Sequence, residues 1–180
     1  RHGEVFNPNG VLYGRLPEFH LSELGQQMAR RVAGYFEEQK NDGAKLVHLV
    51  ASPLTRAQET AAPIAASLGL EIATDERILE ATNKFEGLSG VTSRLRNPKY
   101  WPLMYNPFRP SWGEPYSAQA ERVMAAVTDA RLRATGLAGD RAEAVLVSHQ
   151  LPIWVTRLSA EGRRLWHDPR NRECTLTSVT

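Results

Sequence analysis

The sequence is poor in cysteine, in long apolar runs and in excess charge of one sign, and each absence excludes a class of protein. The single cysteine, Cys174, can form neither an intramolecular disulfide nor a cysteine-built zinc site. No apolar run approaches the roughly eighteen residues that a membrane span requires. Lys and Arg number 22 against 20 Asp and Glu, which gives no field for nucleic acid. We therefore expect a cytoplasmic protein with no nucleic-acid or membrane partner, in which Cys174 is buried filler.

The length of 180 residues fits one domain, covering residues 1–180, with a sizeable hydrophobic core. No internal repeat or low-complexity tract divides it. The chain begins at Arg1, directly on a motif, and stops at Thr180 inside a predicted strand. We expect both ends to be trimmed, with a possible targeting segment upstream.

The hydrophobic pattern predicts alternating helices and strands after a long loop over residues 1–21. Ser22 is a helix N-cap followed by apolar residues at three-to-four spacing, and Gly69 closes an alanine-rich helix. The predicted helices cover residues 22–40, 55–68 and 116–135, with a last one from 152, and the predicted strands cover 46–51, 71–74 and 144–147. This alternation predicts a three-layer α/β/α domain with a mainly parallel central sheet.

Residues 82–115 have no clear period and are too long for a simple connector. They contain five prolines and several large aromatic residues, among them Trp101, Tyr105, Phe108 and Trp112. Such segments are usually lids or binding loops, so we predict a short cap whose aromatic side chains meet the apolar part of a substrate. The alternative is a satellite hydrophobic cluster that holds a loop in place. The cations of the segment are interpreted as solvated surface: Lys84, Arg94, Arg96, Lys99 and Arg109.

Two arginines and two histidines stand out, and the second of each lies at the end of an apolar run. Arg1 and His2 open the chain in Arg1-His2-Gly3-Glu4, Arg56 ends Ser52-Pro53-Leu54-Thr55-Arg56, and His149 ends Leu146-Val147-Ser148-His149. Ligands of parallel sheets bind beyond the carboxyl ends of the strands, where these loops converge. Guanidinium groups match phosphate oxygens in pairs, and imidazole is a nucleophile that titrates near neutrality. The set predicts a phosphate pocket.

These motifs together resemble the histidine phosphatase superfamily, which includes cofactor-dependent phosphoglycerate mutase. The resemblance continues through most of the chain, at Asn7-Pro8 and at residues 12–15, 21–25, 51–61, 79–80, 85–87 and 147–149. It implies the same three-layer fold, with a strand that precedes Arg1 at the centre of the sheet.

The resemblance also implies roles for the site residues. His2 is the nucleophile that forms a phosphohistidine, with one ring nitrogen donating to a backbone carbonyl so that the other faces phosphorus. Arg1, Arg56 and His149 hold the phosphate oxygens, and His149 is counted with the catalytic residues. Asn7 is a further phosphate contact from the loop. Neither a metal nor a cofactor is then needed.

Glu80 is the proposed proton donor to the leaving oxygen, a role that requires a raised pKa. Glu76 and Glu86 are alternatives for this role, as is Glu4, which we expect instead to orient the pocket. Arg15 or His20 would line the entrance. Of the other histidines, we interpret His48 as a satisfied core residue and His167 as a surface residue.

Departures from the mutase pattern favour hydrolysis. Val5 stands where mutases have serine, and the chain between the second arginine and the second histidine is short. We therefore expect a metal-independent phosphomonoesterase that acts on small phosphate esters. The alternatives are a phosphoglycerate mutase or other phosphotransferase, and a catalytically silent domain that binds phosphorylated ligands or a partner. A metallohydrolase is a distant third, because the five histidines show no ligand spacing typical of a metal site.

Overall fold

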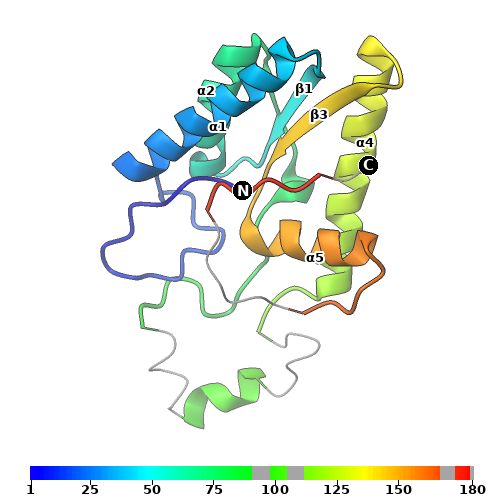
Figure 1. Ribbon diagram of the computed structural model, residues 1–180. Helices are drawn as coiled ribbons and strands as arrows, with labels where there is room; N and C mark the ends of the chain where they lie inside the picture. The colour runs from blue at the N-terminus through cyan, green and yellow to red at the C-terminus, as the bar shows by residue number, and fades with distance from the viewer. Residues whose placement is uncertain (91–97, 105–111, 167–172, 179–180) are drawn as a thin grey trace.

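A parallel three-stranded sheet with helices on both faces forms the core of the computed structural model, which describes residues 1–90, 98–104, 112–166 and 173–178 (Figure 1). Strands β1 (Lys45–Ala51), β2 (Ile72–Thr74) and β3 (Ala142–Val147) lie in the order β2-β1-β3. The helices are α1 (Glu23–Asn41), α2 (Thr55–Leu68), α4 (Tyr116–Ala138) and α5 (Gln150–Ala160), with short 3-10 turns η1 (Glu76–Ile78) and η2 (Pro98–Met104). The predicted α/β/α fold is confirmed.

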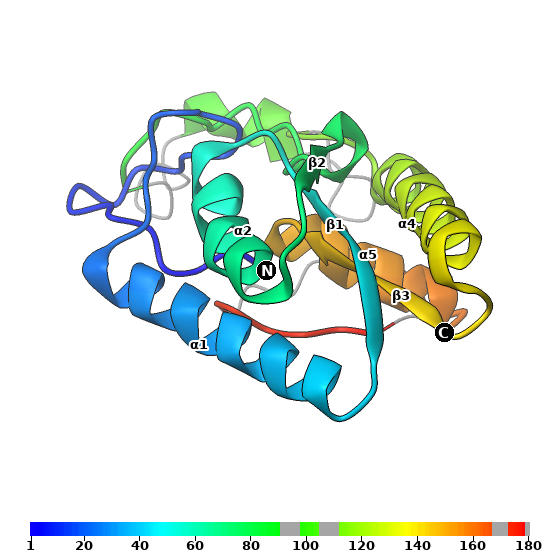
Figure 2. The same cartoon turned by 90° about the horizontal axis from the view of Figure 1, so that it is seen from above.

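Helices α1 and α2 lie on one side of the sheet and α4 on the other (Figure 2). Successive residues of β1 pack with opposite layers. Leu49 and Ala51 pack with the helix pair α1 and α2, whereas Val50 packs with α4 and with Ile78 of η1. Both faces of the strand are therefore apolar, which is why it forms a near-continuous hydrophobic run. Helix α5 covers the amino-terminal end of α4, where Val155 packs against Tyr116 and Ala120. None of the helices in the described ranges has the length and apolar character that a bilayer crossing requires.

The ends of the elements follow local sequence chemistry. Ser22 caps α1 by accepting a hydrogen bond from the Gly25 N–H at 2.9 Å. Helix α2 ends at Gly69, whose φ of 69° is the left-handed conformation that favours glycine. Helix α5 starts directly after His149 rather than at Pro152, because proline is tolerated in the first turn of a helix. The predicted bounds of α2 are those observed, and the others agree with the observed ones to within three residues.

The first 21 residues form the predicted loop, and it runs along several parts of the domain. The His2 N–H donates to the Ser148 carbonyl at 3.1 Å, and the His2 carbonyl accepts from the Cys174 N–H at 3.3 Å. His2 therefore lies beside the carboxyl end of β3. Farther on, isolated bridges pair Val5 with Leu21 and Val11 with Ser89. The loop thus joins the sheet end to the segment that follows residue 82.

The 82–115 segment leaves and rejoins the domain at one point. The Lys84 N–H donates to the Trp112 carbonyl at 2.7 Å, and the Glu114 N–H donates to the Thr82 carbonyl at 3.3 Å. Figure 1 shows η2 projecting away from the sheet, and the side chain of Trp101 on η2 is exposed. Arg94, Arg96, Tyr105, Phe108 and Arg109 lie outside the described residues, so a cap function stays a prediction.

Two predictions about single residues are wrong. Cys174 is only partly buried, because it lies on the carboxyl-terminal stretch that borders His2. His48 is half-buried rather than part of the core, because β1 bulges between Leu46 and His48. Burial and the nearby Arg133 lower the pKa of His48. His167 lies outside the described residues.

Two glycines bring the first motif into direct contact with α1. A Cβ atom on Gly3 would lie 2.5 Å from the Gly25 carbonyl oxygen, and a Cβ atom on Gly25 would collide with the Glu4 carbonyl oxygen. The Ser22 N–H donates to that same Glu4 carbonyl at 3.0 Å. The loop carrying His2 is therefore packed backbone to backbone against the start of α1.

We expect Gly25→Ala to lower the free energy of unfolding by about 1–3 kcal/mol, because backbone atoms cannot move aside as a flexible side chain can. Gly34→Ala in the same helix is the matched control, since nothing lies within 4 Å of a Cβ atom there. Alanine at that position should be neutral or stabilising by up to about 1 kcal/mol. Urea unfolding of both variants checks this, and equal effects at the two positions would contradict the packing argument.

Candidate active site

His2 is buried and is held in one tautomer. Its Nδ1 lies 2.8 Å from the Gly3 carbonyl oxygen, which can only accept, so Nδ1 carries the ring proton. The neutral ring therefore presents an unprotonated Nε2. The Gly3 N–H is fixed in turn by Thr60 Oγ1 at 3.1 Å, and that hydroxyl donates to the Arg56 carbonyl at 2.7 Å. Helix α2 thus sets the position of the imidazole.

His149 lies beside His2 at the carboxyl end of β3, with ring centroids 5.1 Å apart. Its Nε2 is 2.8 Å from Ser52 Oγ, a side chain at the carboxyl end of β1. Both side chains are fully buried. His149 Nδ1 is also buried and has no hydrogen-bond partner among the described residues. Buried polar atoms rarely remain unpaired, so this nitrogen marks a place for a ligand atom.

Arg56 is fully buried in the first turn of α2. Its Nη1 donates to the Leu16 carbonyl at 3.1 Å and its Nη2 to the Gly14 carbonyl at 2.5 Å. The guanidinium also lies 4.7 Å from the centre of the Tyr13 ring. Its Nε is buried without a hydrogen-bond partner in the described parts of the chain. The loop 13–16 therefore holds the guanidinium in place but leaves part of its donor set unused.

Arg1 approaches the same region from the start of the chain. Its Nη1 donates to Gln150 Oε1, in the first turn of α5, at 2.6 Å. Helices α2 and α5 both begin at this end of the sheet, directly after the segments that carry Ser52 and His149. Helix N-termini present unpaired N–H groups and positive potential, so they add to the attraction for an anion.

Glu80 follows η1 and is half-buried, with its Oε1 accepting from the Ala81 N–H at 2.9 Å. Burial raises the pKa of its carboxyl group, while the Ala81 N–H and the charges of Arg56, Arg1 and Arg122 act in the opposite direction. A raised pKa favours the protonated form that a general acid requires.

Electrostatics connects the predicted residues to one another. Burial lowers the pKa of His2 well below the usual value, and the charges of Arg1 and Arg56 lower it further. Burial likewise lowers the pKa of His149 well below its usual value, with His2, Arg56 and Arg1 acting in the same direction. Both rings are therefore neutral at pH 7. The structure thus brings together Arg1, His2, Arg56, Glu80 and His149.

Other predicted residues are engaged elsewhere. Asn7 closes its own loop, donating to the Val11 carbonyl at 2.8 Å and accepting from the Val11 N–H at 3.0 Å. Its phosphate contact stays a prediction. The Glu4 carboxylate accepts from Ser22 Oγ at the start of α1, so it orients the motif through α1 rather than by facing the site. His20 is largely exposed and lies 2.5 Å from Glu59.

The remaining carboxylates differ in their surroundings. Glu76 is exposed, and Glu86 is half-buried with Oε2 2.7 Å from the Arg15 N–H. Arg15 itself donates from Nε to the Glu80 carbonyl at 2.6 Å. A cavity of about 330 Å³ lies next to it, lined by Arg15, Thr82, Asn83, Lys84, Glu86, Trp112 and Gly113. Lys84 is exposed, as expected for a solvated surface residue, and it also lines this cavity.

Sequence reasoning assigned no separate role to three residues that shape the site. Ser52 and Tyr13 belong to motifs that carried the resemblance, but only the fold shows that they contact His149 and Arg56. Thr60 lies one helical turn after Arg56. Its i, i+4 spacing from that predicted site residue is the sequence signal that could have identified it.

Comparison with known proteins decides the family. Residues 1–180 match the family model of the histidine phosphatase superfamily (branch 1). The chain belongs to this superfamily. The uncharacterized protein Rv0525 of Mycobacterium tuberculosis is 50% identical to it over 182 residues, which cover 100% of this chain and 85% of the relative.

Solved structures share the fold of this superfamily member. Bacillus stearothermophilus YhfR superposes with a TM-score of 0.73 at 24% identity, covering 97% of this chain and 85% of YhfR. The mycobacterial glucosyl-3-phosphoglycerate phosphatase Rv2419c superposes with a TM-score of 0.69 at 24% identity, covering 89% of this chain and 76% of that one. At this level of identity the likeness concerns the fold alone.

Lowering the pH should destabilise the protein through its two buried histidines. The unfolded chain protonates histidine near a pKa of 6.5, whereas the folded protein resists protonation of His2 and His149. Stability is therefore present above pH 6.5 and is lost as the pH falls, by about 1.4 kcal/mol per pH unit for each histidine. His149→Gln should reduce the slope between pH 6 and pH 5 by about that amount in urea unfolding. An unchanged slope would mean that His149 is readily protonated in the folded state.

Proposed function

We propose that this superfamily member is a metal-independent phosphomonoesterase that hydrolyses small phosphate esters through a phosphohistidine at His2. The proposal is carried by two buried atoms, Arg56 Nε and His149 Nδ1, that have no hydrogen-bond partner in the parts of the chain that the structure describes. They belong to groups that surround a histidine whose Nε2 is unprotonated. A phosphoryl group would supply the missing acceptor for Arg56 and stabilise the buried positive charge.

In the first step, His2 Nε2 attacks phosphorus opposite the ester oxygen. The N–P bond forms as the P–O bond to the leaving group breaks, and Glu80 gives its proton to the departing oxygen. The Nδ1 proton stays on the ring and keeps its hydrogen bond to the Gly3 carbonyl, which stabilises the positive charge that the phosphorylated ring acquires.

In the second step, water attacks the phosphohistidine. Glu80, now a carboxylate, accepts a proton from that water, and the N–P bond breaks to give inorganic phosphate and neutral His2. Arg1, Arg56 and His149 hold the non-bridging oxygens in both steps, since phosphoryl transfer depends mainly on positioning and electrostatic stabilisation. Over the two steps, ester and water give alcohol and inorganic phosphate, and Glu80 returns to its protonated form.

Two observations favour hydrolysis of small esters over other activities. A glucosyl-3-phosphoglycerate phosphatase shares the fold over most of this chain, so the scaffold is compatible with phosphatase activity. The cavity beside Arg15 is about 330 Å³ and has both charged and aromatic walls, a size and character suited to a small polar leaving group. A phosphotransferase would use the same first step, and the products distinguish the two activities.

The first test uses His2→Ala. Release of inorganic phosphate from a panel of phosphomonoesters that includes 3-phosphoglycerate, in the presence of a chelator, should be measurable for the wild type and lost in the variant. Rapid quenching with a ³²P-labelled ester should give acid-labile, base-stable label on the wild type only. Label retained in His2→Ala would exclude His2 as the nucleophile. Accumulation of 2-phosphoglycerate without free phosphate would point to a mutase instead.

The second test concerns the general acid. Glu80→Gln should slow hydrolysis of an alkyl phosphate by about 10²-fold or more, because its alkoxide leaving group needs a proton. Nitrophenyl phosphate should be affected much less, since nitrophenolate leaves without protonation. Glu76→Gln, an exposed carboxylate on the preceding 3-10 turn, is the matched control and should leave both rates unchanged. Equal losses on the two substrates in Glu80→Gln would remove Glu80 from this role.

A further inference from the structure

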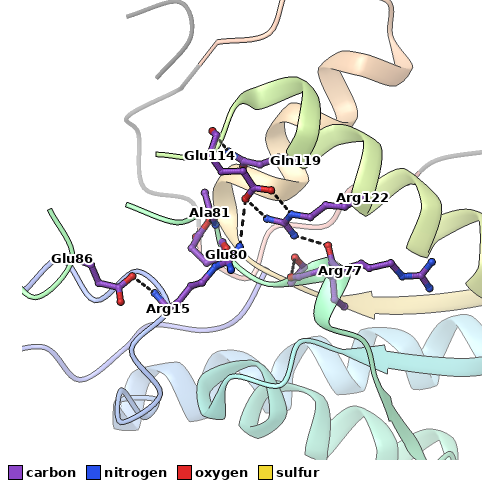
Figure 3. Close-up of polar contacts among 10 residues, drawn as sticks. Arg15, Arg77, Glu80, Ala81, Glu86, Glu114, Gln119 and Arg122 are labelled. Carbon is purple, nitrogen blue, oxygen red and sulfur yellow. Dashed lines mark hydrogen bonds and ion pairs between the residues drawn. The ribbon is translucent and has the colours of Figure 1, made fainter. Parts of the chain in front are cut away.

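Glu114 is the centre of a polar network that surrounds the Glu80 segment (Figure 3). Its Oε1 accepts from Arg122 Nε at 2.7 Å, and its Oε2 accepts from Arg122 Nη2 at 2.8 Å. Oε2 also lies 3.4 Å from Arg15 Nη2. The Glu114 side chain is only 16% exposed. A carboxylate that binds one guanidinium with both oxygens and reaches a second one orients both arginines.

The two arginines hold both ends of the segment that leads to the proposed general acid. Arg15 Nε donates to the Glu80 carbonyl at 2.6 Å, and Arg122 Nη1 donates to the Arg77 carbonyl at 2.5 Å. Figure 3 shows them approaching the 77–81 stretch from different parts of the chain. The short turn η1 gives this segment two backbone hydrogen bonds, from the Ile78 N–H to the Asp75 carbonyl at 3.4 Å and from the Leu79 N–H to the Glu76 carbonyl at 3.1 Å. No strand or α-helix continues the segment through Glu80, so the side chains of Arg15 and Arg122 add restraint at its two ends.

Glu114 is itself placed by neighbouring backbone groups. Its N–H donates to the Thr82 carbonyl at 3.3 Å, and its carbonyl accepts from Gln119 Nε2 at 3.0 Å. A Cβ atom on Gly113 would lie 2.5 Å from the Thr82 carbonyl oxygen, so this close approach requires glycine. The carboxylate thus lies where the 82–115 segment joins α4, within reach of both arginines that bind the Glu80 segment.

The negative charge of Glu114 partly offsets the positive charges of the two arginines beside it. Arg122 is among the positive charges that lower the pKa of Glu80, opposite to the effect of burial. The Glu114 carboxylate pairs with Arg122 and Arg15 and so offsets their positive charge near the acid. Removing the negative charge would leave the two guanidiniums uncompensated and would lower the pKa of Glu80.

We propose that Glu114 is a positioning residue for the general acid: through Arg15 and Arg122 it fixes the segment that carries Glu80. The proposal rests on the proposed function, because it concerns proton donation by Glu80. Glu114 does not touch the phosphoryl group, and its effect passes through hydrogen bonds to the carbonyls of Glu80 and Arg77.

The test compares Glu114→Gln with the wild type on an alkyl phosphate and on nitrophenyl phosphate across pH. We expect about a tenfold loss of kcat/KM on the alkyl ester, a loss below about threefold on the nitrophenyl ester, and an alkaline limb of the alkyl profile moved to lower pH. Glu161→Gln is the matched control, because Glu161 also accepts from two arginines, Arg157 and Arg163. It lies at the other end of α5, about 18 Å along the helix from His149.

A double variant separates positioning of the acid from a general loss of structure. If Glu114 acts through Glu80, then adding Glu114→Gln to Glu80→Gln should cause little further loss on the alkyl ester. Equal losses on both esters with an unmoved pH profile, or full additivity with Glu80→Gln, would overturn the proposal. If Glu114→Gln fails to fold, Arg122→Lys applies the same measurements, because lysine keeps the charge but cannot bind Glu114 and the Arg77 carbonyl together.

The outcome is distinguishable from failure of the proposed function. Absence of labelled His2 in the wild type, or equal losses on both esters in Glu80→Gln, would overturn the phosphohistidine mechanism itself. The positioning role alone would be overturned by a different result. His2 would be labelled and Glu80→Gln would slow the alkyl ester selectively, but Glu114→Gln would behave like Glu161→Gln.

Discussion

The burial of Arg56 with no carboxylate bonded to it in the described parts of the chain is the constraint on which the rest of the site depends. The guanidinium is fully buried, and its contacts are the carbonyl oxygens of Gly14 and Leu16 and the face of the Tyr13 ring. Such contacts satisfy donors but do not cancel charge, and an uncompensated buried charge is costly. Burial lowers the pKa values of His2 and His149 and the Arg56 charge lowers them further, so both rings stay neutral at pH 7. A phosphoryl group would compensate the charge. The free energy lost by burying the charge in the free protein would then be recovered when the ligand binds.

The N-terminal loop has its shape because it must surround this arginine. Gly14 has a φ of 38°, and a Cβ atom there would collide with the Glu86 carboxylate, so glycine is required where the chain turns over Arg56. The Glu86 carboxylate in turn accepts from the Arg15 N–H. At the other end of the loop, Gly3 and Gly25 allow the contact of the His2 motif with α1. The irregular backbone of this loop is thus as closely specified as a helix, but by tertiary contacts.

The helices, the parallel sheet and the grouping of the site residues could be predicted because their signals are local. Ser22 and Gly69 mark helix ends by their own chemistry, and Arg56 and His149 follow apolar strands whose carboxyl ends meet. The position of His48 could not be predicted, because the bulge in β1 shifts the register without any mark in the sequence. The bonds of the Asn7 amide to Val11 could not be predicted from its motif, and its phosphate contact stays a prediction. The network of Glu114 joins segments far apart in the chain, and only folding reveals it.

The paired stem of the 82–115 segment makes that segment a module. Its two ends are joined by the Lys84–Trp112 and Thr82–Glu114 backbone hydrogen bonds, so the chain between them starts and finishes at one place on the domain. The entropy of closing such a loop grows slowly with its length, by roughly 0.6 kcal/mol for each doubling. A change in the length of the segment therefore costs little closure entropy, provided that the contacts of residues 85–89 with the N-terminal loop are kept. Length variation in the segment is thus largely independent of the sheet and helices to which its two ends are joined.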